Sequence, residues 1–415
     1  MFAVLTQNPQ FRRLWSAQVV SAAGDWLNRI AVLALIDRLG GTQQAVGVGL
    51  LFAVEYVVRL LPTAVFSALA GPVADRLPRR MIMVAADLAR AAVVACLLFI
   101  DTPAELPLLY GLIIAQMSIA IFFDSARSGA LPNTVRRQDL HAAYALSAAT
   151  WSTMLAFGAF LGGVLVEVIG IRGVFLCDVA SYLVSAAFLI RLQLPTVAAQ
   201  PERFRWRDIF LLTDLRRGFD HTRQLGIWPI LFSKVMWSPC GGFIVLFPLL
   251  ARQFDRGADL KEAGATIGLL FAARGVGTGL GPLAAKRLLG SSPAALIRQS
   301  WGGMLVGAAG YSCLAIAPNL PLSMAAITLA HMGGSAQWVG STTYWQHRVD
   351  DAFRGRVFAC EFLFMTLAFS VFAFASGFLF DRLENLQTVI WIWVAATLLG
   401  ALIARLWFRR LPVTA

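Results

Sequence analysis

Apolar runs about 20 residues long recur along the whole chain, and they restrict its possible folds more than any other feature of the sequence. A helix needs roughly 20 residues to cross the hydrocarbon core of a bilayer, whereas a barrel strand needs about 9–11. Runs of the helical length are found at 14–37, 46–70, 81–100, 107–128, 140–168, 171–193, 228–251, 263–285, 296–317, 320–346, 357–380 and 386–408. The pattern predicts an all-α membrane protein with twelve transmembrane helices, because helices satisfy their own backbone groups in lipid.

The composition agrees with this interpretation. Hydrophobic residues make up 58% of the 415 residues and charged residues 14%, against roughly 45–50% and about 25% in soluble proteins. A water-soluble enzyme and a disordered chain are therefore excluded. The net charge of +12 does not indicate nucleic acid here, because membrane proteins concentrate Lys and Arg on their cytoplasmic side.

The distribution of positive charge predicts the orientation. With both termini in the cytoplasm, the inner segments hold 24 Lys and Arg residues and the outer segments hold 6. The reverse topology would violate the positive-inside rule. We therefore expect cytoplasmic N- and C-termini in a multi-pass protein of the plasma membrane, which for a bacterium is the inner membrane.

A long polar stretch divides the chain into two halves. Residues 1–193 hold the first six spans and residues 228–415 hold the other six, with a cytoplasmic linker at 194–227. Within the linker, Leu211, Leu215 and Phe219 recur at helical spacing, which fits either a short surface helix or a solvated connection. Two halves with six spans each are typical of transporters built from internal repeats.

Ionisable side chains lie deep inside several predicted spans. Asp25 and Arg29 are four residues apart near the middle of the first span, and Glu55 and Arg59 repeat this spacing in the second. Asp124, Lys234, Arg274 and His331 lie within later spans. Each costs at least about 2.5–3.5 kcal/mol in lipid, so such residues either line a water-filled cavity or pair permanently. The sequence leaves both alternatives open.

Three short motifs make the chain resemble a known family. Gly71, Asp75, Arg76, Arg79 and Arg80 follow the second span with the spacing of the loop signature of the major facilitator superfamily, and residues 281–287 partly repeat this segment after span eight. Residues 11–26 and 354–357 are similar to the subgroup of bacterial macrolide-efflux and enterobactin-exporter permeases. The chain departs from the family pattern in span four, where no arginine precedes Gln116.

The resemblance implies a fold and a site. The fold is two pseudo-symmetric six-helix bundles in which spans one, four, seven and ten line a central cavity. The candidates for that cavity and for proton coupling are Asp25, Arg29, Glu55, Arg59, Gln116, Asp124, Lys234, Trp237, Arg274, His331, Gln337, Trp338 and Trp345. Asp25 is the expected proton carrier, and the tryptophans offer stacking surfaces unless they serve packing or the membrane interface.

The loop after the second span predicts a conformational latch. The Asp75 carboxylate can accept hydrogen bonds from nearby arginines or from the N-terminus of a facing helix, and such bonds would hold one arrangement of the halves. The alternative is that Asp75 only caps the third span while Arg76, Arg79 and Arg80 set the topology.

These features together predict a secondary transporter with alternating access. It exports a hydrophobic or amphipathic organic solute, such as a drug-like compound or a siderophore, with protons as the coupling ion. Cations within the spans leave room for an anionic group on the solute. The sequence has no nucleotide-binding loop, no GxSxG motif and no metal-ligand spacing, so we expect no enzyme, cofactor or metal. A lysophospholipid flippase and a non-transporting scaffold are the alternatives, and we expect a monomer.

Overall fold

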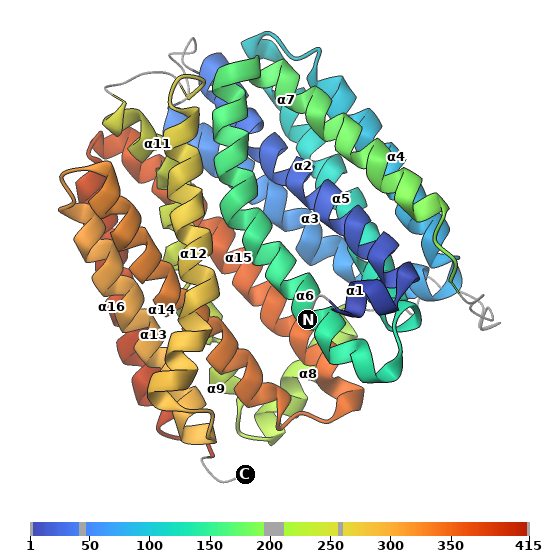
Figure 1. Cartoon of the computed structure of the whole chain (residues 1–415). Coiled ribbons are helices and arrows are strands. Elements are labelled where there is room, and N and C mark those ends of the chain that lie inside the picture. Colours follow the sequence, from blue (N-terminus) through green and yellow to red (C-terminus); the bar gives the residue numbers. More distant parts are fainter. Residues whose placement is uncertain (1–2, 41–46, 195–210, 256–259, 413–415) are drawn as a thin grey trace. The chain divides into compact units, whose positions relative to one another are not determined.

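The computed structural model describes residues 3–40, 47–194, 211–255 and 260–412. Throughout these ranges the chain is built from helices, and they contain no β-strand (Figure 1). Each of the twelve predicted spans coincides with a helix or a helical run. The prediction of an all-α chain is therefore confirmed.

The chain divides into two compact units, and each is described by itself. Unit 1 comprises Met1–Gln44, Val58–Ile209 and Ala258–Gly268. Unit 2 comprises Ala45–Val57, Phe210–Gly257 and Leu269–Ala415. One helix near the N-terminus and one near the middle of the chain therefore contribute residues to both units.

The helices before the linker belong mainly to unit 1. They are α1 (Ala3–Gln7), α2 (Pro9–Gly40), α3 (Val48–Arg76), α4 (Arg79–Leu97), η1 (Pro103–Glu105), α5 (Leu106–Ala130), η2 (Leu131–Thr134), η3 (Arg137–Asp139), α6 (Leu140–Thr153), η4 (Met154–Gly158) and α7 (Ala159–Ile190). The η4 segment is a π-helical turn between α6 and α7. The predicted break between spans five and six falls at Gly170, whose φ of 73° and ψ of 170° suit glycine alone.

The helices after the linker belong mainly to unit 2. They are α8 (Leu211–Gln224), α9 (Trp228–Leu231), α10 (Ser233–Met236), α11 (Pro239–Phe254), α12 (Gly264–Leu289), α13 (Pro293–Ala315), α14 (Leu320–Gln346), α15 (Asp351–Leu383) and α16 (Leu386–Phe408). The seventh predicted span is thus broken into α9, α10 and α11. Pro229 and Pro239 stand in the first turns of α9 and α11, where a missing N–H costs nothing.

Most of the long helices can cross a membrane by length and composition. Eight helical segments of the described chain meet both conditions, and one of them, Arg137–Ile190, is 54 residues long, enough for two crossings of about 20 residues each. The helices α4, α13 and α14 are outside these eight. In α4 the reason is charge, because its 19 residues include Arg79, Arg80, Asp87 and Arg90.

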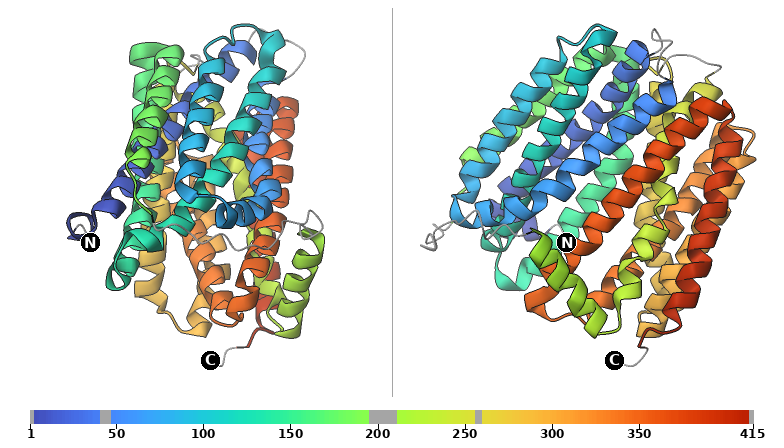
Figure 2. Two further views of the ribbon diagram at one scale, coloured as in Figure 1. Left: turned by 90° about the vertical axis from the view of Figure 1, so that its right-hand side faces the viewer. Right: turned by 180° about the vertical axis from the view of Figure 1, so that it is seen from behind.

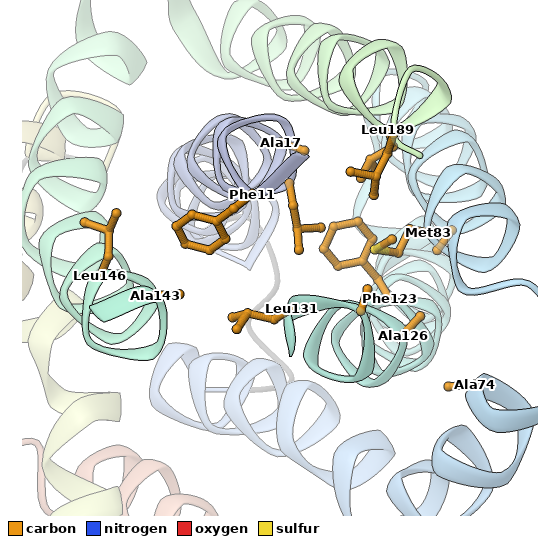
Figure 3. Packing of buried hydrophobic residues seen from close by; sticks show 14 of the residues in the cluster. Phe11, Ala17, Ala74, Met83, Phe123, Ala126, Leu131, Ala143, Leu146 and Leu189 are labelled. Carbon is orange, nitrogen blue, oxygen red and sulfur yellow. The ribbon is translucent and has the colours of Figure 1, made fainter. Parts of the chain in front are cut away.

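A buried apolar cluster holds unit 1 together at the end where α2 begins and α7 finishes. Figure 3 shows side chains from α2, α4, α5 and α7 converging there, among them Phe11, Met83, Phe123 and Leu189. All four are nearly inaccessible to solvent. The cluster fixes the mutual positions of four helices, and these same helices carry the charged groups described below.

Close contact between α2 and α7 depends on Gly24. A Cβ atom at this position would overlap the side chains of Ser181 and Asp178, and it would lie 2.8 Å from the Ser181 Cβ. By contrast, a Cβ atom at Gly111 in α5 would meet nothing within 4 Å. The two glycines are therefore a matched pair for testing this packing.

We expect Gly24→Ala to destabilise the protein by about 1–3 kcal/mol, because overpacking forces α2 and α7 apart. Gly111→Ala should be neutral or stabilising, since alanine favours a helix by about 1 kcal/mol over glycine. Thermal unfolding of both purified variants in one detergent measures the difference. Equal stability of the two variants would contradict the described packing.

In unit 2, α13 and α14 run side by side (Figure 2). Small residues allow this approach: a Cβ atom on Gly303 would overlap the Gly333 carbonyl, and one on Gly310 would overlap the backbone of Ala330. The linker contributes α8, whose Gly218 lies against the backbone of Arg356 in α15. Residues 195–210 of the predicted linker are outside the described residues.

Candidate functional site

Unit 1 contains a cavity of about 240 Å³ whose walls are both charged and aromatic. Four of the predicted site residues, Asp25, Arg29, Arg59 and Asp124, line it. The other lining residues are Gln18, Ser21, Ala22, Trp26, Arg90, Met117, Ala120, Phe123, Arg127 and Trp151. Helices α2, α3, α4, α5 and α6 thus all contribute side chains to one space.

Asp25 is held by two residues from other helices. Its Oδ2 lies 3.5 Å from Nη1 of Arg90 in α4, and its Oδ1 accepts a hydrogen bond from the hydroxyl of Tyr182 in α7. The Asp25 side chain is nevertheless 35% exposed, whereas that of Arg90 is 3% exposed. A carboxylate of this kind is oriented by fixed partners and remains accessible to water or a solute.

Arg90 is the central cation of this network, and sequence reasoning gave it no role. Its Nη2 lies 2.5 Å from Oδ1 of Asp87, and its guanidinium carbon lies 4.6 Å and 4.4 Å from the ring centroids of Phe123 and Tyr182. Ser185 also donates to Asp87 at 2.6 Å. The spacing of Asp87 and Arg90 in the middle of an apolar run is the same kind of signal that identified Asp25 and Arg29, so it was available in the sequence.

Gln116 does not line the cavity but contacts Tyr182, the residue that donates to Asp25. It is buried, and its Nε2 donates to the Tyr182 hydroxyl at 3.0 Å. Asp178, one turn before Tyr182 in α7, is fully buried and accepts from the Ser181 hydroxyl at 3.2 Å. A chain of polar groups therefore runs from the exposed carboxyl of Asp25 into the packed interior of unit 1.

The remaining unit 1 candidates lie at different depths. The Asp124 side chain is 67% exposed and lies 3.5 Å from Nε of Arg127, one turn along α5. The Arg29 guanidinium lies 5.5 Å from the Trp26 ring, and Nη1 of Arg59 lies 3.8 Å from the Met117 sulfur. The cavity wall is thus built from cation–aromatic and cation–sulfur contacts as well as ion pairs.

Glu55 is buried, and it belongs to unit 2 whereas Arg59 belongs to unit 1. Both residues are on α3, at the point where the units divide this helix. Their i, i+4 spacing puts them on the same side of α3. The predicted role of Glu55 in the cavity stays a prediction.

The arginines of the predicted latch loop bind backbone carbonyl groups within unit 1. Arg79 donates to the carbonyls of Ala74, at 3.2 Å, and Gly129, and Arg80 donates to that of Leu192 at 3.3 Å. Gly129 and Leu192 lie at the C-terminal ends of α5 and α7, where cations complement the helix dipole.

The other residues of the predicted latch are Gly71, Asp75 and Arg76. Gly71 and Arg76 lie in the last two turns of α3. The side chain of Asp75 is outside the described part of the structure. The latch itself stays a prediction.

Unit 2 contains a buried ion pair between Lys234 of α10 and Glu361 of α15. The Lys234 Nζ lies 2.7 Å from Oε2 of Glu361, and both side chains are at most 2% exposed. Lys234 also donates to the Thr342 hydroxyl at 2.8 Å and lies 4.1 Å from the Trp338 ring centroid. Glu361 was not predicted, although a carboxylate one turn into the predicted span 357–380 is a signal of the same kind.

Two of the predicted tryptophans contact the members of this ion pair. Trp345 is buried and donates from Nε1 to Glu361 at 3.3 Å, while Trp338 is half-buried beside Lys234. Trp237 is buried against Gly334, with its ring centroid 6.0 Å from that of Phe369. All three rings contact other side chains of unit 2, and their predicted role in binding a solute stays a prediction.

The remaining unit 2 candidates divide between two places. Gln337 is buried and donates to the Ser233 hydroxyl at 3.1 Å, next to Lys234 in sequence. His331 instead lies with Tyr311, whose hydroxyl is 3.1 Å from His331 Nε2 and 3.1 Å from the Cys240 sulfur. Arg274 is electrostatically coupled to this second cluster. Unit 2 therefore has two separate polar clusters, with Lys234 in one and His331 in the other.

Comparison with known proteins identifies the family. The sequence profile of the Major Facilitator Superfamily matches residues 14–298. The chain belongs to this superfamily. The predicted family is therefore confirmed, and the apolar helices of this major facilitator protein agree with a multi-pass membrane protein.

Two bacterial proteins are relatives of this major facilitator protein. It is 23% identical over 391 residues to macrolide efflux protein A of Streptococcus pyogenes, covering 90% of each chain. It is also 25% identical over 241 residues to the uncharacterized MFS-type transporter YkuC of Bacillus subtilis. The matched region covers 58% of this chain and 54% of that protein. The chain thus spans about half the length of one relative and nine-tenths of the other.

Solved structures support the fold. The nucleoside transporter NupG superposes with a TM-score of 0.75 at 13% identity, covering 95% of this transporter and all of that chain. A bacterial homologue of the lysosomal transporter Spinster gives a TM-score of 0.72, also at 13% identity, covering 97% of each chain. The predicted fold class, the helical fold of the major facilitator superfamily, is confirmed.

Proposed function

We propose that this transporter exports a hydrophobic or amphipathic organic solute from the bacterial cytoplasm in exchange for protons, and that Asp25 is the carboxyl group that carries the proton. The uneven distribution of Lys and Arg supports an inner-membrane orientation with both termini in the cytoplasm. The 90% coverage of macrolide efflux protein A supports export of an organic compound.

The observation that carries this proposal is the position of Asp25. It lies near the middle of α2, a 32-residue helix, and its side chain is partly exposed in the unit 1 cavity. Burying a carboxyl group at mid-membrane depth costs free energy, and such groups therefore indicate a functional site, here one for a transported proton. Asp25 differs in this respect from the fully buried Lys234 and Glu361, which are enclosed by their partners.

The contacts of Asp25 suggest how proton binding is coupled to the rest of unit 1. The ionised carboxylate pairs with Arg90 and accepts from Tyr182, whereas the protonated carboxyl loses its charge-based attraction to Arg90. Arg90 then retains Asp87 at 2.5 Å and stays paired. The network therefore tolerates both protonation states of Asp25 without leaving the arginine unpaired.

Proton movement in inside-out vesicles tests this function. Vesicles that contain the transporter are loaded with acid by respiration, and the interior pH is followed with a fluorescent amine. We expect erythromycin, 2,3-dihydroxynaphthalene or both to release more of the proton gradient in these vesicles than in vesicles that lack the transporter. A lysophospholipid serves as the third probe.

Two results would refute the proposal. If the lysophospholipid alone were transported, and no protons moved with it, the protein would be a lipid flippase and not a solute exporter. If no probe were moved in either direction, even by counterflow, a non-transporting role would replace both.

A further inference from the structure

We infer that the solute bound in the unit 1 cavity is an uncharged, planar aromatic compound that carries a hydroxyl group. This inference rests on the proposed proton exchange and adds a chemical class to it. It comes from three properties of the cavity wall, namely its aromatic side chains, its charged groups and the partly exposed carboxyl group of Asp25.

Aromatic side chains from three helices form part of the wall. Trp26 belongs to α2, Phe123 to α5 and Trp151 to α6, and all three line the same cavity. Phe123 lies beneath Arg90, but Trp151 remains 51% exposed. An indole that lines the cavity and remains this exposed suits stacking on a flat ring.

The charge balance of the wall disfavours a cationic solute. Four arginines line the cavity, whereas its lining includes two carboxylates, Asp25 and Asp124. Each carboxylate already lies 3.5 Å from an arginine nitrogen. A cationic solute would therefore have to compete with an arginine for either carboxylate, and it would be repelled by the arginines of the lining.

Proton exchange disfavours an anionic solute. An anion beside Asp25 repels the carboxylate and stabilises its protonated form, so anion and proton would bind together. Exchange requires the opposite, because solute and proton must compete for the site. A hydroxyl group meets this requirement, since it donates a strong, charge-assisted hydrogen bond to the ionised carboxylate and a weaker one to the protonated carboxyl group.

The size of the cavity fits the same class. Sites that enclose drug-sized ligands have volumes of about 300–1,000 Å³, and this cavity of about 240 Å³ is slightly smaller. It therefore accommodates a small fused-ring system or the aromatic end of a longer solute. Guanidinium groups such as that of Arg29 can donate to further oxygens on the ring.

Equilibrium binding to the full-length protein in nanodiscs tests the inference without any gradient. The probes are 2,3-dihydroxynaphthalene and its dimethyl ether, which share the ring and differ in the hydroxyl donors, with empty nanodiscs as the blank. We expect the diol to bind at least about tenfold more tightly than the ether at neutral pH. Acidification should weaken diol binding and leave ether binding unchanged.

Three variants assign the binding to this cavity. Trp151→Leu should lower the affinity for the diol roughly tenfold, and Trp151→Phe should lower it less, because phenylalanine keeps an aromatic ring. Trp391→Leu is the matched control, because Trp391 on α16 is 45% exposed and does not line this cavity, and it should have no effect. Asp25→Asn should remove the pH dependence of diol binding. The groups around Asp25 that also act on its charge are Arg90, Tyr182, Asp178, Asp124 and Arg59.

Equal affinity for diol and ether, or unchanged diol binding in Trp151→Leu, would overturn the inference. These outcomes are separate from failure of the proposed function. Binding with the expected preferences but without proton movement in vesicles would refute proton exchange alone, whereas proton-coupled export of erythromycin without diol binding would refute the aromatic class alone.

Discussion

Replacing Lys234 with methionine is expected to lower the free energy of unfolding by about 3–5 kcal/mol. The substitution leaves the Glu361 carboxylate buried with a single remaining donor, Nε1 of Trp345 at 3.3 Å. A buried charge without its counter-ion costs far more than the ion pair contributed. Thermal or denaturant unfolding in detergent measures the loss, and Lys286→Met at the exposed end of α12 is the control.

A second substitution should reverse most of this loss. In Lys234→Met/Glu361→Gln no charge remains at the site, and the glutamine carbonyl still accepts from Trp345. Neutral replacements of buried ion pairs are often as stable as the pair itself. If the double variant were as unstable as Lys234→Met alone, the loss would come from packing around Lys234 and not from the charge on Glu361.

The fold could be predicted from the sequence to a large extent because lipid imposes a length and a polarity on each helix. Separate helices α13 and α14 follow from Asn319, whose side chain caps α14, and the reversal between spans five and six follows from Gly170. The division of span seven into three short helices was not predicted. Prolines in the first turns of α9 and α11 were visible, but whether proline kinks or ends a helix depends on its neighbours.

The candidate site could be predicted only in part. Asp25 and Asp124 were found because each is a carboxylate in an apolar run. The sequence places Asp25 and Arg29 four residues apart on one helix, and the structure adds an ion pair between Asp25 and Arg90 of α4 that was not predicted. Spacing along one helix is readable from a sequence, but contacts between helices depend on their rotation and depth.

The position of Arg90 is also relevant to the family pattern, which has an arginine in span four that this chain lacks. No arginine precedes Gln116 in α5, but the guanidinium of Arg90 lies over the ring of Tyr182, and Gln116 donates to the hydroxyl of the same tyrosine. A cation from α4 and Gln116 thus contact the same residue. This relation was hidden from sequence reasoning because the two residues are far apart along the chain.

Asp25→Asn is expected to abolish proton-driven transport while the protein stays folded. The asparagine oxygen can still accept from Tyr182, and Arg90 keeps its contact with Asp87 at 2.5 Å, so no buried cation is left without a partner. The loss should exceed about 100-fold in the initial rate driven by a pH gradient, which corresponds to about 2.7 kcal/mol. Unfolding temperature and yield should match those of the unchanged protein.

Transport by Asp25→Asn in proteoliposomes, measured with and without a pH gradient, tests the role of Asp25 most directly. We predict that a labelled solute recognised by the unchanged protein still exchanges by counterflow in the variant, and that a pH gradient no longer drives its accumulation. Gradient-driven accumulation at the unchanged rate would contradict the account, because the proton would then be carried by another group.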